Sequence, residues 1–176
     1  DENDPPKIID GSITIEDDDD THIVGGTVTI SSGYLTGDVL TLTGQGDING
    51  GVSNSSGILT ITTTAPVTSV TLAEYELALE SITYHSTNEN PTDNNPSASR
   101  TISWLVTDAN SDGAGPGTSI EVISTITITP INDAPVMTAG ATLSYTENET
   151  ATVIDNTITI SDVDDSQLNS AIVTIS

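Results

Sequence analysis

A stretch of 23 residues occurs twice in this 176-residue chain. Residues 9–31, IDGSITIEDDDDTHIVGGTVTIS, align without a gap with residues 154–176, IDNTITISDVDDSQLNSAIVTIS, at an offset of 145 positions. Twelve of the 23 aligned positions are identical. Similarity at a fixed period is typical of tandem-repeat proteins. We therefore expect the chain to span slightly more than one period of an array, with a cut inside a repeat at each end.

The boundary between the two copies is expected near TPINDAPVM (129–137), where two prolines follow a long alternating run. This gives a first repeat at 1–131, without the residues that would match APVMTAGATLSY, and a tail at 132–176. A tail of this length is too short to build an independent core. Two outcomes stay open. The tail is the N-terminal part of the following repeat, or it folds back and supplies the missing edge strand of the first.

Apolar and polar residues alternate along most of the chain. In TISWLVT (101–107), Ile102, Trp104 and Val106 fall on one face, so we expect Trp104 in the core. Period-two alternation, β-branched residues and Gly-rich turns are typical of a β-sandwich. In the run 119–129, the residues expected on one face are Ile120, Val122, Ile126 and Ile128. Shorter runs lie at 12–15, 27–31, 39–43, 58–62, 82–86, 141–145 and 156–160.

The segment TLAEYELALE (71–80) departs from this alternation. Thr71 and Glu74 have the spacing of a capping box, in which each side chain bonds the backbone N–H of the other residue. Apolar residues then recur at helical spacing, so we predict one short helix in an otherwise all-β fold. The sequence leaves open whether the acids of this helix only face water or take part in a site: Glu74, Glu76 and Glu80.

The charge of the chain excludes several classes of partner. It carries 26 acidic residues against two strong bases, Lys7 and Arg100, for a formal net charge of −24. Nucleic acids and anionic membranes attract basic surfaces, so neither is expected as a partner. No apolar run approaches the roughly 20 residues needed for direct membrane insertion. The chain has no cysteine, and a metal is a common alternative to disulfides. We expect a fold that stays weak until its acids are neutralised.

The acids are spaced in a way that suits a divalent cation. Two aspartates alternate at matching positions of the two copies: Asp17 and Asp19 in one, Asp162 and Asp164 in the other. Alternating carboxylates can point at one centre, and Ca²⁺ takes six to eight oxygen ligands. The second copy replaces one acid by Val163 and still keeps this alternation. The sequence therefore favours a calcium site, and a merely solvated acidic loop is the alternative.

Three segments resemble motifs of cadherin repeats. ISWLVTDANSDGAGPGTSIEVISTITITPINDAP (102–135) resembles the end of such a repeat, YTENE (145–149) its early Glu-Asn-Glu calcium motif, and DVDD (162–165) its Asp-x-Asp motif. The longer period and Thr-rich strands are more similar to the cadherin-like repeats of large bacterial adhesins, which type I systems secrete and which carry RTX repeats elsewhere. The resemblance implies a cadherin-like or Ig-like antiparallel β-sandwich located outside the cell, at its surface.

The resemblance also implies a set of calcium ligands at the junctions between repeats. The junction inside this chain would draw on both repeats and on the linker, with Glu2, Asn132, Asp133, Asp162 and Asp164 as ligands. The equivalent upstream junction would use Asp17, Asp19 and Asp108, and Glu147 would serve a downstream one.

The function that the resemblance implies is structural. The chain would be a calcium-binding extender repeat of a secreted adhesin, stiffened by Ca²⁺ at its junctions and in contact with neighbouring repeats of the same chain. The alternative is a calcium-dependent, lectin-like module that binds a surface polysaccharide or another cell-surface protein. We do not expect an enzyme, because no nucleophile or phosphate-binding motif occurs and because His22 and His85 stand alone.

Overall fold

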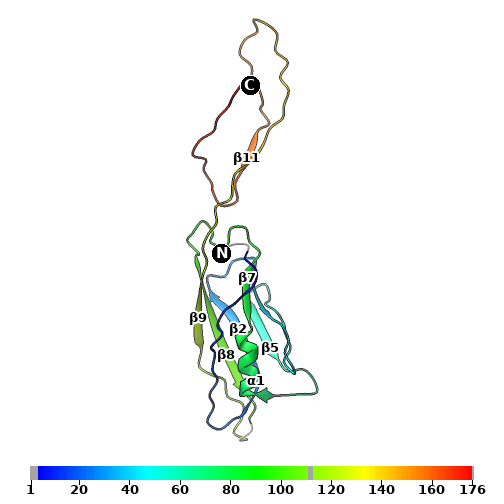
Figure 1. The fold of residues 1–176 in the computed structure, drawn as a ribbon, viewed down its shortest axis with the longest axis vertical. Coiled ribbons are helices and arrows are strands. Elements are labelled where there is room, and N and C mark those ends of the chain that lie inside the picture. The colour runs from blue at the N-terminus through cyan, green and yellow to red at the C-terminus, as the bar shows by residue number, and fades with distance from the viewer. Residues whose placement is uncertain (1–3, 111–112, 176) are drawn as a thin grey trace. The chain divides into compact units, whose positions relative to one another are not determined.

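The computed structural model describes residues 4–110 and 113–175. The chain divides into two units, Asp1–Pro130 and Ile131–Ser176, which are described separately. Their secondary structure consists of strands in antiparallel sheets and one short helix (Figure 1), which confirms the all-β, sandwich-like fold. No helix in the described part of the chain has the length and apolar character required to cross a membrane.

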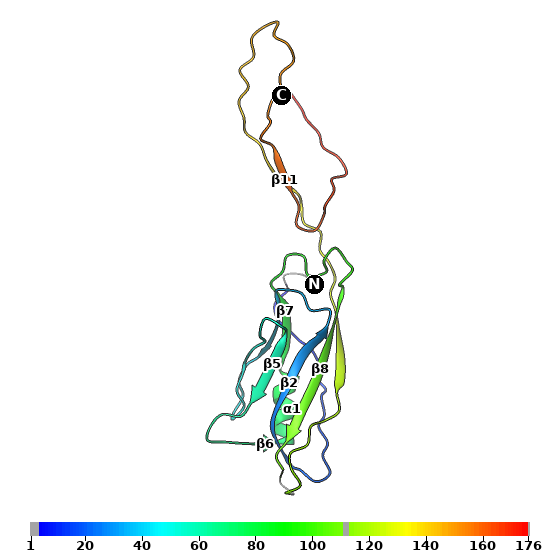
Figure 2. The same cartoon turned by 180° about the vertical axis from the view of Figure 1, so that it is seen from behind.

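The first unit contains two sheets. One has the strand order β1-β7-β3-β4, built from β1 (Lys7–Ile8), β7 (Thr83–Ser86), β3 (Asp38–Leu42) and β4 (Gly51–Val52). The other has the order β5-β2-β8-β9, built from β5 (Ile58–Thr62), β2 (His22–Ser32), β8 (Ser99–Asp108) and β9 (Val122–Thr127), while β6 (Val70–Thr71) pairs with the start of β2. Figure 2 shows β2 and β8 side by side in the middle of this second sheet.

The predicted helix forms as α1 (Leu72–Glu80), and its capping box is confirmed. The N–H of Thr71 donates to Glu74 Oε2 at 3.0 Å, and Thr71 Oγ1 accepts from the N–H of Glu74 at 3.3 Å. The helix buries Tyr75, Ala78 and Leu79 in the core of the first unit. Glu76 Oε1 accepts the backbone N–H of Ile15 at 2.7 Å, so one acid of the helix anchors the N-terminal segment.

The core lies between the sheets and beneath α1. Its fully buried apolar side chains come from α1, the turn after it and the strands β2, β3, β5 and β8, where alternation predicts inward positions. Trp104 is 6% exposed, which confirms its expected core position. The largest of the fully buried apolar side chains are Ile23, Leu40, Leu42, Leu59, Ile61, Tyr75, Ile82 and Ile102.

A buried ion pair connects the two sheets. Arg100 on β8 is fully buried, and its Nε lies 2.5 Å from Oδ2 of Asp38 on β3. A second contact joins Nη2 to Asp38 Oδ1 at 3.2 Å. Tyr84 on β7 donates its hydroxyl to the same Oδ1 at 2.6 Å. The remaining guanidinium donors bond the carbonyls of Pro91 and Ser97, both at 2.6 Å.

Two sequence expectations differ from the structure. The runs 12–15 and 141–145 belong to no strand, although their alternation predicted one. The run 119–129 forms a shorter strand, and two of its expected core residues are exposed: Ile120 by 86% and Val122 by 59%. The reason is positional, because β9 is an edge strand that pairs only with β8 among the described residues.

The second unit holds a short two-stranded sheet. β10 (Val136–Thr138) pairs antiparallel with β11 (Thr159–Ser161), with Met137 opposite Ile160. None of the described residues in this unit is buried, and apolar side chains such as Val173 (88% exposed) face solvent. This segment on its own cannot enclose an apolar core.

Candidate metal centre

Three carboxylates converge immediately after β11. Asp162, Asp164 and Asp165 each offer an oxygen, and these oxygens lie within 4.8 Å of one another. Asp162 forms the turn, because its Oδ1 accepts the backbone N–H groups of Asp164 at 3.3 Å and Asp165 at 3.1 Å. In the described part of the chain, no other group of three acids or histidines meets this spacing. The cluster could therefore hold a metal ion.

The linker contacts this cluster. The N–H of Asp133 donates to Asp164 Oδ2 at 2.9 Å, across 31 positions of sequence. The side chain of the preceding residue, Asn132, donates from Nδ2 to the carbonyl of Asp133 at 2.6 Å. Four of the predicted ligands, from the linker and from the Asp-x-Asp motif, are thus brought to one end of the second unit: Asn132, Asp133, Asp162 and Asp164.

The other oxygen of Asp164 is in an unfavourable position. Oδ1 is buried, and no donor reaches it. A buried acceptor without a donor is destabilising, more so when it is charged. The carboxyl groups of Asp162 and Asp164 can share a hydrogen bond only when one of them is protonated. When both are ionised they repel each other, and a bound cation would relieve that repulsion.

The pKa values of the pair reflect this competition. A hydrogen bond shared with Asp164 is the largest contribution that lowers the pKa of Asp162, and backbone N–H groups add to it. At Asp164 the N–H of Asp133 lowers the pKa most, but the bond to Asp162 and burial together outweigh it, and the pKa rises. One carboxyl of the pair therefore keeps its proton to higher pH than a free aspartate.

The first unit contains the same turn at the matching positions. Asp17 Oδ1 accepts the N–H of Asp19 at 3.2 Å and that of Asp20 at 2.9 Å. Both hydrogen bonds lower the pKa of Asp17, and the bond from the N–H of Asp20 makes the larger contribution. The side chains of this loop do not form a three-acid cluster with the spacing seen after β11. The backbone turn of the repeat is thus reproduced here without the group of three converging acids.

A second turn also recurs at the offset of 145. Asp10 Oδ1 accepts from the N–H and Oγ of Ser12, at 3.1 and 2.9 Å. Asp155 Oδ1 accepts from the N–H and Oγ1 of Thr157, at 2.7 and 2.6 Å. The sequence repeat is therefore also a repeat of local structure, with matching turns on both sides of residues 13–16 and 158–161.

Asp108, which was expected at the upstream junction, accepts hydrogen bonds from the loop that follows β8. Its two carboxylate oxygens each accept the N–H of Gly117 at 2.9 Å, and Oδ1 also accepts that of Asn110 at 3.3 Å. Its backbone pairs with Ile23 of β2, close in sequence to the loop of Asp17 and Asp19. Asp17, Asp19 and Asp108 do not form a group of three converging acids, and the carboxylate of Asp108 closes the loop after β8.

Of the two remaining predicted ligands, only Glu147 lies among the described residues. Glu147 is exposed and is not part of the three-acid group, and Glu2 lies outside the described residues. Conversely, the ligand set from the sequence omitted Asp165. The signal for it was present, because Asp165 matches Asp20 in the repeat and directly follows the Asp-x-Asp motif.

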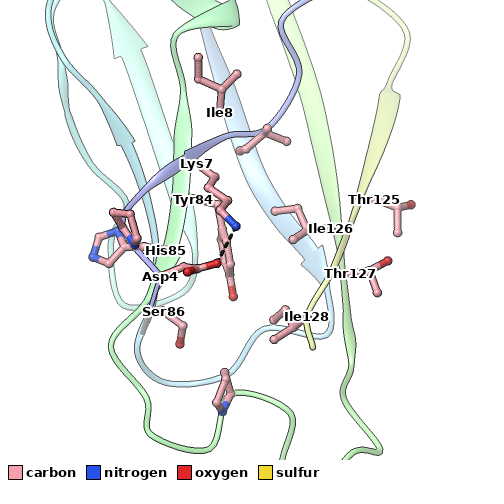
Figure 3. Close-up of a pocket in the computed structure, with 13 residues that line it drawn as sticks. Asp4, Lys7, Ile8, Tyr84, His85, Ser86, Thr125, Ile126, Thr127 and Ile128 are labelled. Carbon is pink, nitrogen blue, oxygen red and sulfur yellow. Dashed lines mark hydrogen bonds and ion pairs between the residues drawn. The ribbon is translucent and has the colours of Figure 1, made fainter. Parts of the chain in front are cut away.

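A cavity of about 260 Å³ in the first unit offers a different environment (Figure 3). Asp4 and Lys7 form an ion pair at its edge, with Nζ 2.5 Å from Oδ2, and this bond lowers the pKa of Asp4 to about 2. Tyr84 also lines the cavity, but its hydroxyl is bound to Asp38. Burial, and then the bond to Asp38, raise the pKa of Tyr84 well above the usual range. The tyrosine hydroxyl in this cavity is therefore held as a neutral donor.

Comparisons with known proteins add no relative: no family model, no curated protein and no solved structure matches this chain. Only the residues of the site and the fold therefore indicate what the chain does.

Proposed function

We propose that this chain is a calcium-binding extender repeat of a secreted cell-surface adhesin. The observation that carries the proposal is the bond from the linker N–H of Asp133 to Asp164, inside the cluster of Asp162, Asp164 and Asp165. One cation bound there would fix the linker to the loop of the repeat that follows it. A chain of such joints is a stiff rod, which suits a protein that projects a binding domain away from a cell.

The chemistry of the donors favours Ca²⁺ among the common metals. The cluster offers only oxygen ligands, and the chain has no cysteine to attract a softer metal. Asn132 and Asp133 lie next to the cluster in the linker and would add two more oxygens as ligands. Mg²⁺ demands near-ideal octahedral geometry and keeps its waters, whereas Ca²⁺ accepts a larger and more flexible oxygen shell.

Calcium would also stabilise the second unit. This unit buries none of its described residues, so ligand binding is a substantial part of the free energy available to it. Extracellular modules bind Ca²⁺ with dissociation constants of about 10⁻⁴–10⁻³ M. At roughly tenfold excess over that constant, binding stabilises the folded state by about 1.4 kcal/mol. The lectin-like alternative gains no support from Trp104, because a buried indole cannot stack on a sugar.

The first test is calcium titration of the ¹⁵N-labelled full chain, followed by NMR. We expect saturable shifts of the Asp133, Asp164 and Asp165 amides with Ca²⁺, and much weaker ones with Mg²⁺. The double variant Asp162→Asn/Asp164→Asn should remove them, although Asn can still accept the turn N–H bonds through Oδ1. Asp47→Asn is the matched control, because Asp47 is exposed and outside the cluster. Shifts spread over all surface acids without saturation would contradict the proposal.

The extender function needs a second measurement. ¹⁵N relaxation reports the rotational correlation time of each unit separately. In Ca²⁺ the two units should share one rotational correlation time. In EDTA each unit should have its own correlation time, and both should be shorter than the shared one. If calcium binds at the cluster but the two correlation times stay different, the site is real and the stiffening role is wrong.

A further inference from the structure

The loop between β3 and β4, residues 43–50, reaches across to the other sheet of the first unit. The backbone N–H of Asn49 donates to the carbonyl of Thr62 at 2.8 Å, and the N–H of Thr64 donates to the carbonyl of Asp47 at 2.7 Å. β3 and β4 belong to one sheet and β5 to the other. These bonds therefore connect the two sheets at the edges formed by β4 and β5.

The side chain of Asn49 completes this connection with both of its polar atoms. Nδ2 donates to Thr62 Oγ1 at 3.1 Å and to the carbonyl of Thr63 at 2.9 Å, and Oδ1 accepts from Thr64 Oγ1 at 3.1 Å. The neighbouring Ile48 is 3% exposed and belongs to the core. The contacts require an amide at position 49, because a carboxylate has no N–H to donate to the carbonyl of Thr63.

Residue 50 has to be glycine for a different reason. A Cβ on Gly50 would lie 2.1 Å from the backbone nitrogen of Gly44 and 2.3 Å from the carbonyl oxygen of Leu42, so no side chain fits there. The fold therefore places a glycine directly after the asparagine. Asn-Gly occurs once in the 176 residues, at 49–50. Because glycine has no Cβ, its backbone nitrogen can approach the side chain of the preceding asparagine without hindrance.

We propose that Asn49 is a site of spontaneous deamidation, which the loop suppresses while its bonds to β5 and the residues after it are formed. In this reaction the backbone nitrogen of Gly50 bonds to Cγ of Asn49, and Nδ2 leaves as ammonia. Water then opens the succinimide ring to aspartate or isoaspartate, with no change of oxidation state. Attack makes Cγ tetrahedral and turns its polar atoms away from the three threonines. The rate should therefore follow the population of molecules in which the loop has opened.

The product would no longer fit the closed loop. An aspartate at position 49 brings a carboxylate against the carbonyl of Thr63, where two acceptors meet without a donor, and such a contact is destabilising. Isoaspartate also lengthens the backbone by one methylene group beside Gly50, where the surrounding backbone leaves no room for a Cβ. Deamidation is therefore a one-way change, since it records that the loop has opened and then opposes its closure.

Peptide mapping by mass spectrometry measures the reaction at each asparagine of the full chain. Samples are kept in neutral buffer with EDTA, either folded or in guanidinium chloride, and the sum of aspartate and isoaspartate at position 49 is followed with time. We expect deamidation of Asn49 to be at least about tenfold slower in the folded protein. In guanidinium chloride, Asn49 should react faster than Asn54, because Asn54 is followed by serine.

A variant of the threonine contacts tests the protection. Thr62→Val/Thr64→Val removes both hydroxyls that bond the amide of Asn49, and it should raise the rate in the folded protein at least about threefold. The rate in guanidinium chloride should stay the same. Thr60→Val, at an exposed position of β5, is the matched control and should leave both rates unchanged.

A second variant tests the product. Asn49→Asp should lower the midpoint of thermal unfolding, followed by the fluorescence of Trp104. Asn54→Asp makes the same change of charge in a nearby turn and is the control. Asn54 Oδ1 accepts the N–H groups of Ser56 and Ile58, and a carboxylate can accept both, so this midpoint should stay near that of the wild type.

Three results would each overturn the proposal. Equal rates of deamidation at Asn49 in folded and unfolded protein would mean that the loop gives no protection. A rate at Asn49 no higher than at Asn54 in guanidinium chloride would mean that Asn49 is not a preferred site. Equal unfolding midpoints for Asn49→Asp and Asn54→Asp would mean that the product fits the closed loop.

Discussion

Replacing Asp38 by asparagine should destabilise the first unit more than any other single loss of an acid. Both partners of the Asp38–Arg100 pair have side chains that are 0% exposed. The carboxylate accepts two guanidinium bonds and the hydroxyl of Tyr84. Asparagine keeps one acceptor oxygen and the shape of the side chain, but it removes the counter-charge of an arginine that cannot release its proton.

The magnitude follows from the burial of the pair. Removing one member of a buried ion pair costs about 3–5 kcal/mol, because the other charge stays buried and uncompensated. Arg100 keeps its bonds to the carbonyls of Pro91 and Ser97, so we expect the lower part of that range for Asp38→Asn. This is a large share of the roughly 5–15 kcal/mol that stabilises a typical domain. Asp38→Asn/Arg100→Met removes both charges and should be no less stable than Asp38→Asn.

Urea unfolding followed by Trp104 fluorescence measures these changes, because Trp104 lies in the core of the same unit. The titrations are run in EDTA so that bound calcium does not contribute. The m-value should stay constant while the midpoint falls. A loss below about 1 kcal/mol for Asp38→Asn, or a double variant whose loss equals the sum of the two single losses, would refute the reasoning that the pair is buried and coupled.

Two further predictions concern the contact of α1 with β2. Tyr75 has a buried hydroxyl without a hydrogen-bond partner, so Tyr75→Phe should leave the stability at neutral pH unchanged or raise it by up to about 1 kcal/mol. Burial also raises the pKa of Tyr75 above its usual value near 10, so the wild type should lose stability as pH rises above about 10, where the unfolded tyrosine ionises first. In chemical unfolding as a function of pH, the variant should lose less stability in that range, and identical alkaline profiles would count against this account. Gly26→Ala should destabilise by at least about 1–3 kcal/mol, since its Cβ would lie 2.5 Å from the carbonyl oxygen of Leu105; Gly11→Ala, with no atom nearby, is the control, and equal unfolding midpoints would contradict the close approach.

Local patterns in the sequence predicted local structure well. The helix at 71–80 and its cap follow from the spacing of Thr71 and Glu74 alone, and the alternating runs of β2, β5 and β8 lie in strands. The ion pair of Asp38 and Arg100 could not be predicted, because its members are 62 positions apart and nothing in the sequence indicates that the one arginine is buried.

The candidate site, too, could be predicted from the sequence only in part. The repeat pointed to Asp162 and Asp164, and the turn at Asp162 brings their oxygens together. It gave equal weight to Asp17 and Asp19, whose turn is the same but which do not belong to a group of three converging acids. That difference depends on side-chain directions and on neighbouring chain segments. Two loops with the same sequence pattern can differ in the directions of their side chains and in the segments that surround them.

The two units differ in what can stabilise them, and this locates the expected effect of calcium. The first unit has an apolar core and a buried ion pair, neither of which needs a metal. The second unit has a two-stranded sheet, no buried residue among those described, and the acid cluster. We therefore expect neutralisation of the acids to stabilise the second unit more than the first. Signals from Asp133 and Asp164 should respond to calcium over a range in which Trp104 does not change.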